Sequence, residues 1–102
     1  MKITIIPKDG KVVVDGEGYS GLDLSGLDQS IHAVQWYDAD GEVEVKDTRG
    51  RIVENREITS FSEFAFVIPL WEVAKLKAMQ DAQAAADAMA AAEADAQAQQ
   101  TP

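Results

Sequence analysis

Apolar and polar residues alternate along the first 58 residues of the chain, with the two-residue period that is typical of β-strands. The clearest segments are KITII at residues 2–6 and KVVV at residues 11–14, which are rich in Ile and Val. Asp9 and Gly10 lie between them, and an Asp-Gly pair is a strong signal for a hairpin turn. We therefore expect the chain to open with a hairpin whose second strand ends at the sequence DGEG, residues 15–18.

The segment SGLDLSGLD at residues 20–28 has neither the helical nor the strand period, because its leucines recur at an uneven spacing. This pattern predicts a tight loop that holds its leucines on the core. A Ca²⁺ site built from Asp23 and Asp28 is the alternative, but the segment lacks the spacing of an EF-hand and the six or more oxygen ligands that Ca²⁺ requires.

A third strand is expected over residues 31–37, IHAVQWY, where successive side chains point to opposite faces. Trp36 and Tyr37 therefore belong to different faces, and His32 and Val34 share the face of Trp36. One of the two aromatic side chains can then lie in the core while the other lies at the surface.

The next two strands follow tight turns. In the first turn, residues 38–41, Gly41 is able to take a positive φ. Residues 42–46, EVEVK, alternate strictly, so the valines face the core and the charged residues face water. A turn at residues 47–50 leads to RIVE at residues 51–54. Together these segments predict an antiparallel β-meander of about five short strands.

Helical signals replace the strand period after residue 58. Ser60 and Glu63 have the spacing of a capping box, which predicts a short helix over FSEFAFV, residues 61–67. Pro69 suits the first turn of a helix, so we expect a second, long helix to begin there. The apolar stripe expected on this helix consists of Leu70, Val73, Ala74 and Leu76, with Trp71 beside it.

From Ala78 onward the chain is almost wholly Ala, Gln, Asp and Glu, a composition that strongly favours helix. Met79 and Met89 fall with Ala82 and Ala86 at three-four spacing. This pattern indicates either a thin seam for self-association or partner binding, or a solvated helix that frays toward its end. The fold class is therefore α+β, with a β-rich domain and its closing helix at residues 1–76 and a helical tail at residues 77–102.

Composition narrows the chemistry further. Eighteen acidic residues against nine basic ones give a formal charge of −9, which disfavours binding to nucleic acid or to anionic membrane surfaces. The chain has no cysteine and a single histidine, His32, which excludes disulfides, thiolate sites and a His-rich metal site. No apolar run approaches the roughly 18 residues of a membrane-spanning helix. We find no catalytic motif and expect a soluble, non-enzymatic protein without metal or cofactor.

Aromatic and methionine side chains are the remaining candidates for a binding surface. Trp36 fits either a core anchor or an interface hot spot, and both interpretations stay open. Trp71 lies at the base of the tail, where it could anchor the helix or a partner. The candidate interface residues are Trp36, Tyr37, Trp71, Met79 and Met89.

The string IHAVQWYDADGEVEVKD, with the segment before it and the start of the last helix at Trp71 and Ala74, resembles a family of small bacteriophage proteins. These proteins are encoded beside the tail-fibre genes of tailed phages of Gram-negative hosts and are known as tail-fibre assembly proteins. The resemblance covers roughly residues 1–75. It implies a chaperone that binds the C-terminal region of a phage tail fibre, or another tail protein, and promotes trimerisation in the host cytoplasm.

Two other functions are compatible with the same sequence. One is a minor structural component of the virion or tail, in which the β-domain docks and the helix bridges subunits. The other is a small acidic inhibitor whose surface imitates nucleic acid and occupies a host nucleic-acid-binding enzyme; the net charge allows this function, but no residue spacing requires it.

Overall fold

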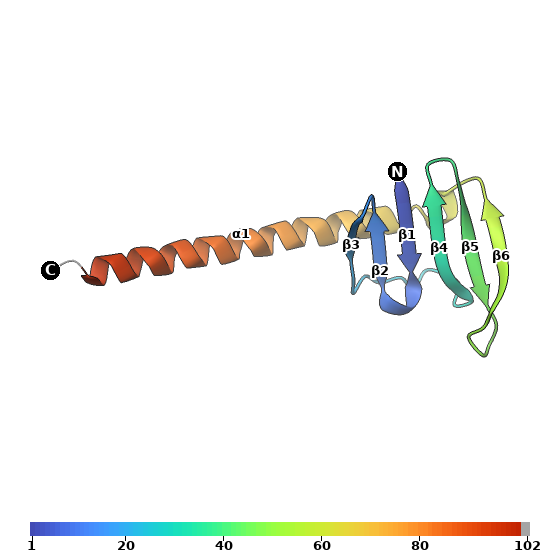
Figure 1. Cartoon of the computed structure of the whole chain (residues 1–102), viewed down its shortest axis with the longest axis horizontal. Helices are drawn as coiled ribbons and strands as arrows, with labels where there is room; N and C mark the ends of the chain where they lie inside the picture. Colours follow the sequence, from blue (N-terminus) through green and yellow to red (C-terminus); the bar gives the residue numbers. More distant parts are fainter. Residues whose placement is uncertain (101–102) are drawn as a thin grey trace.

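The computed structural model describes residues 1–100 of the chain, with side chains for residues 1–93. Over this range the protein consists of one six-stranded sheet and one long helix (Figure 1). The strands are β1 (Lys2–Ile6), β2 (Lys11–Val14), β3 (Glu17–Tyr19), β4 (Ile31–Tyr37), β5 (Asp40–Lys46) and β6 (Ile52–Ile58). The helix is α1 (Val67–Gln100), and single 3-10 turns lie at Pro7–Asp9 and Ser62–Phe64. The predicted α+β class is confirmed.

All neighbouring strands are antiparallel, in the order β3-β2-β1-β4-β5-β6. The core lies on one face of this sheet, where directly opposed residues form continuous apolar rows such as Val14, Ile3 and Trp36. The side chains that cover this face come from other segments and are Leu24, Leu27, Phe64 and Val67. The loop before β4 therefore holds leucines on the core, as predicted.

The strand count of five was wrong, because the chain turns back after β2 instead of leaving the sheet. Asp15 and Gly16 have φ values of 49° and 86°, and Val14 pairs with Glu17 across them. Two consecutive residues with positive φ make a type I′ turn, the tightest connection that fits the twist of a hairpin. The segment DGEG thus begins β3 rather than ending the sheet.

The short helix predicted over residues 61–67 was also wrong, since only Ser62–Phe64 forms a 3-10 turn. The hydroxyl of Ser60 accepts a hydrogen bond from the backbone N–H of Ser62 at 3.2 Å. Glu63 does not complete a capping box and instead lies 3.7 Å from the guanidinium of Arg56. The long helix begins at Val67, two residues earlier than expected, and still keeps Pro69 in its first turn.

A β-bulge in β4 changes the predicted faces of this strand. Ile31 pairs with Val45 and Ala33 pairs with Glu44, which leaves His32 as the extra residue. His32 is exposed, whereas Ile31 joins Val34 and Trp36 in the core. Ile31, and not His32, is therefore the residue at this end of β4 that is buried with Trp36, because strict alternation fails at a bulge.

The turn after β4 also differs from the expectation. The positive φ belongs to Asp38, at 55°, and not to Gly41. Gly41 is buried in β5 directly opposite Trp36. A glycine is required there because the two strands approach too closely to admit a Cβ atom.

Three aspartates fasten turns by accepting hydrogen bonds from residues that follow them. Asp23 accepts from the backbone N–H and hydroxyl of Ser25, at 3.1 and 2.6 Å, and Asp28 binds Ser30 in the same way at 2.9 and 2.8 Å. These hydrogen bonds lower the pKa of both carboxyl groups, mainly through the hydroxyl for Asp23 and the backbone N–H for Asp28. Residues 23–25 and 28–30 thus form the same kind of turn.

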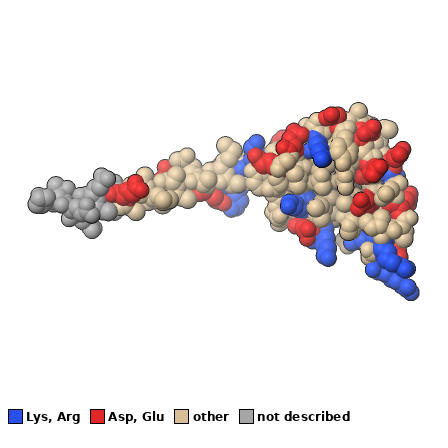
Figure 2. Space-filling view, in the orientation of Figure 1, with Lys and Arg blue, Asp and Glu red and all other residues tan. Residues whose placement is uncertain are grey.

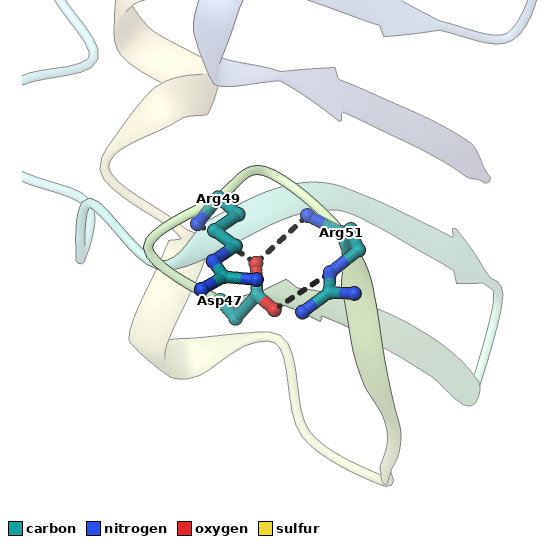
Figure 3. A network of polar contacts seen from close by, with 3 residues as sticks. All are labelled: Asp47, Arg49 and Arg51. Atoms are coloured by element: carbon teal, nitrogen blue, oxygen red, sulfur yellow. Dashed lines mark hydrogen bonds and ion pairs between the residues drawn. The ribbon is translucent and has the colours of Figure 1, made fainter.

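The third such turn joins β5 to β6 (Figure 3). Asp47 Oδ1 accepts the backbone N–H groups of Arg49 and Arg51, both at 2.9 Å, and Oδ2 accepts Nε of Arg51 at 3.2 Å. The pKa of Asp47 is lowered, chiefly by the backbone hydrogen bond from Arg51. The predicted turn at residues 47–50 is confirmed.

Replacing Ser25 with Ala should raise the pKa of Asp23 toward its ordinary value of 3.8, because the hydroxyl is its strongest hydrogen-bond donor. A carboxyl-carbon NMR titration measures this shift, and Asp28 serves as the internal control that should not move. Both carboxyl groups have lowered folded-state pKa values, so they stabilise the fold above pH 3.8 and lose that contribution as the pH falls below it. An unchanged Asp23 titration would contradict the turn geometry.

Candidate interaction surface

Trp36 lies in the core. Its side chain is 8% exposed, and its ring centroid is 5.5 Å from that of Phe61, which follows β6 in the chain. Of the two interpretations left open for Trp36, the structure supports the core anchor. A side chain this deeply buried is not accessible to a partner, so Trp36 does not belong to a binding surface of the folded protein.

Tyr37 lies on the outer face of the sheet and is 43% exposed. Its hydroxyl donates to Oε1 of Gln35 at 2.7 Å, and Nζ of Lys2 lies 5.3 Å from the ring centroid. Tyr37 also borders a shallow depression of about 410 Å³ whose lining includes Glu42 and Glu57, which are directly opposed on β5 and β6. This part of the outer face is therefore acidic, with one aromatic ring at its margin.

Trp71 attaches α1 to the short edge strand β3. Its indole Nε1 donates to the backbone carbonyl of Glu17 at 2.8 Å, and its ring meets Tyr19 edge-on at 5.8 Å. Lys75, one turn later, lies 5.1 Å from the Trp71 ring and 3.6 Å from the carboxylate of Glu17. Of the two roles considered for Trp71, the structure shows the anchor of the helix.

Beyond Lys75, α1 leaves the domain and continues as an unsupported rod (Figure 1). Every described side chain from residue 76 to residue 93 is exposed. The segment from Lys75 to Gln100 spans roughly 38 Å at 1.5 Å per residue, which accounts for much of the 72 Å length of the molecule. Local ion pairs and hydrogen bonds, such as Lys77 with Asp81 at 2.8 Å, are the side-chain interactions found along this part.

The start of the rod and the helical turn just before it carry large apolar side chains in water. Val73, Leu76 and Met79 follow one another at three-residue spacing and are 67%, 55% and 60% exposed. We name these three residues the rod strip; they form one slowly turning row along the helix. Met89 lies further out and is 65% exposed.

The predicted apolar stripe of the helix is thus divided between two sides. Leu70 and Ala74 are half-buried on the side that meets the sheet, together with Trp71. Val73 and Leu76 point away from it and were not recognised as surface residues from the sequence. The spacing of these residues already indicated an exposed apolar side. The start of the helix is apolar on two sides, and a single sheet can cover only one of them.

The five candidate interface residues are not brought together at one site. Trp36 is in the core, Tyr37 is on the outer face, Trp71 holds the helix to β3, and the two methionines lie along the rod. Acidic side chains are scattered over the visible face of the β-domain, and basic side chains lie among them, with one group at its lower right corner (Figure 2). Among the described side chains of α1, the large apolar ones that are exposed are those of the rod strip and Met89.

Within the described residues, no three His, Asp or Glu side chains come together in an arrangement that could hold a metal ion. The described helix lacks the combination of length and apolar character needed to cross a membrane. Comparisons with protein-family models, with curated proteins and with solved structures each found no match.

Proposed function

We propose that the protein is a non-enzymatic assembly factor for phage tail fibres and that it acts by binding another protein through α1. The observation that carries this proposal is the rod strip, which is a row of large apolar side chains on a helix that projects from a folded domain. The resemblance of residues 1–75 to tail-fibre assembly proteins supports the choice of partner. This role places the protein in the host cytoplasm while phages assemble.

The physical basis is that an exposed apolar row gains free energy when a partner covers it. Burying one Val, Leu or Met side chain contributes up to about 1.5–3 kcal/mol, so the three residues supply part of the free energy that offsets the cost of association. An amphipathic helix that lies in an apolar groove uses anchors at this kind of spacing. The Ala-rich sequence keeps the helix formed before binding, which lowers the ordering cost.

The proposal is tested by co-expressing the protein with the fibre protein encoded beside it. We expect a higher yield of soluble trimeric fibre than from the fibre gene alone, together with co-purification. The double variant Leu76→Glu and Met79→Glu should reduce the yield to the level seen without the protein, because it places charge on the rod strip. The control Ala78→Glu and Ala85→Glu adds the same charge to the opposite side of the helix, where both residues are exposed, and should retain the effect. If the wild-type protein neither changes the yield nor co-purifies, the proposal is wrong.

A second candidate function is a structural part of the virion. It is favoured by the separation of two surfaces, with Tyr37 on the outer face of the sheet and the rod strip on the helix, since a bridging component needs two contacts. Mass spectrometry of purified virions distinguishes the two functions. A chaperone that leaves after assembly should be absent, whereas a structural component should be present in stoichiometric amount.

A further inference from the structure

The two edges of the sheet differ in length and in how they are covered. At the β3 edge the strand has three residues, and the indole N–H of Trp71 donates a hydrogen bond to the backbone carbonyl of Glu17. At the other edge β6 has seven residues and is paired on one side only, with β5. No described element lies beyond β6 (Figure 1), so one row of its backbone N–H and C=O groups is open to pairing with another strand.

The sequence of this open strand, IVENREI, is self-complementary in charge. In a dimer whose two-fold axis is perpendicular to the sheet, each side chain stays on the same face of the sheet in both copies. A residue of one copy can therefore lie opposite only a residue that is an even number of positions away in the sequence of the other copy. When two copies of β6 pair antiparallel about Asn55, Glu54 of each copy lies opposite Arg56 of the other. Opposite charges that face each other across two strands stabilise their pairing.

Other registers lose this complementarity. Centring the pair on Glu54 places Glu54 opposite itself, and centring it on Arg56 does the same for Arg56. Centring the pair on Glu57 places Glu57 opposite itself, which again opposes two acids. Centring it on Val53 is disfavoured because Val53 is the extra residue of a β-bulge between β6 and β5. Parallel, in-register pairing would set every charged residue beside its own copy. Charge therefore selects one arrangement.

The side chains involved are available for such contacts. Glu54 and Arg56 lie opposite Val45 and Val43, which places them on the core face at its outer margin. Every residue of β6 from Ile52 to Glu57 is exposed. The guanidinium of Arg56 lies 3.7 Å from the carboxylate of Glu63, and the two side chains of that ion pair are 47% and 66% exposed.

We propose that the β6 edge is a dimerisation site, at which two copies of the protein join their six-stranded sheets into one continuous antiparallel sheet. The rods do not obstruct this contact, because α1 leaves the domain past β3, on the side away from β6 (Figure 1). In the dimer the two rods extend in opposite directions. This inference does not depend on the tail-fibre role, and it differs from self-association through the tail helix.

The first test exchanges the two charges. We expect sedimentation equilibrium to give twice the chain mass of 11.0 kDa for the wild-type protein. Glu54→Arg opposes Arg to Arg56, and Arg56→Glu opposes Glu to Glu54, so each single variant should dimerise roughly tenfold or more weakly. The double exchange Glu54→Arg with Arg56→Glu restores both pairs and should restore the dimer. An equimolar mixture of the two single variants should form a heterodimer for the same reason.

The second test uses the absence of cysteine from the chain. Asn55 lies opposite its own copy, and opposed residues have Cα atoms about 4.5–5.5 Å apart, which is within disulfide range. Asn55→Cys should therefore give a covalent dimer on a non-reducing gel after mild oxidation. Glu57→Cys, on the same strand and face, is the control; its two copies would be about 14 Å apart and should stay unlinked.

Each result bears directly on the proposal. A monomeric wild-type protein, a dimer that survives both single charge variants, or equal cross-linking at positions 55 and 57 would overturn it. Circular dichroism spectra of all variants establish that the sheet is intact. Since Glu54, Asn55, Arg56 and Glu57 are exposed, none of these changes removes a core contact.

Discussion

Replacing Trp36 with Ala should lower the free energy of unfolding by about 3–5 kcal/mol, the usual cost of truncating a buried aromatic side chain to Ala. Trp36 is 8% exposed, packs on Phe61, and lies between Ile3 of β1 and Gly41 of β5 in the sheet. Since small domains have a total stability of roughly 5–15 kcal/mol, the variant should lose a large fraction of its stability. Urea unfolding followed by circular dichroism measures the loss without relying on Trp fluorescence.

Tyr37→Ala is the matched control for this change. Tyr37 is the next residue in β4, but it lies on the outer face and is 43% exposed, so its loss should cost within about 1 kcal/mol. The contrast tests the assignment of faces directly. If Trp36→Ala were as stable as Tyr37→Ala and affected only partner binding, Trp36 would be an interface residue and its placement in the core would be wrong.

The strands that bury one face could be predicted from the sequence. The bounds of the edge strands could not be predicted from the same pattern. Alternation identified the positions of β1, β2 and β4, because one face of each strand lies on the core. Burial imposes no such pattern on an edge strand whose two faces are both exposed. RIVE was recognised at residues 51–54, but the remainder of β6, which extends to Ile58, reads as a polar segment.

The candidate surface depended on contacts between segments that are far apart in the chain. That Trp36 and Tyr37 point to opposite faces followed from their adjacency, but the choice of the buried one depends on Phe61, which comes from beyond β6. The bond from Trp71 to Glu17 spans 54 positions, and it decides which side of α1 is covered. Local periodicity contains no information about such pairs, so the exposed side of the helix became evident only from the fold.

Gly41→Ala should destabilise the protein by about 1–3 kcal/mol or more, the usual cost of forcing an added carbon atom into a packed interior. A Cβ atom at this position would collide with the backbone carbonyl oxygen of Gln35 and would lie 3.0 Å from both Cα and Cε3 of Trp36. Two of these three neighbours are backbone atoms, which the pairing of β4 with β5 holds in place. Relief therefore requires the strands to separate.

Gly26→Ala separates this steric effect from the general effect of replacing glycine. A Cβ atom on Gly26 would meet only the ring of Phe66, at the ordinary contact distance of 3.4 Å. Its effect on the free energy of unfolding should stay within about 0.5 kcal/mol, since replacing glycine also reduces the entropy of the unfolded chain. Urea unfolding of both variants gives the comparison. If the two variants were equally stable, β5 would not pass Trp36 as closely as the structure shows. If only Gly41→Ala lost stability, Gly41 would be required for close packing of the strands and not for a positive φ.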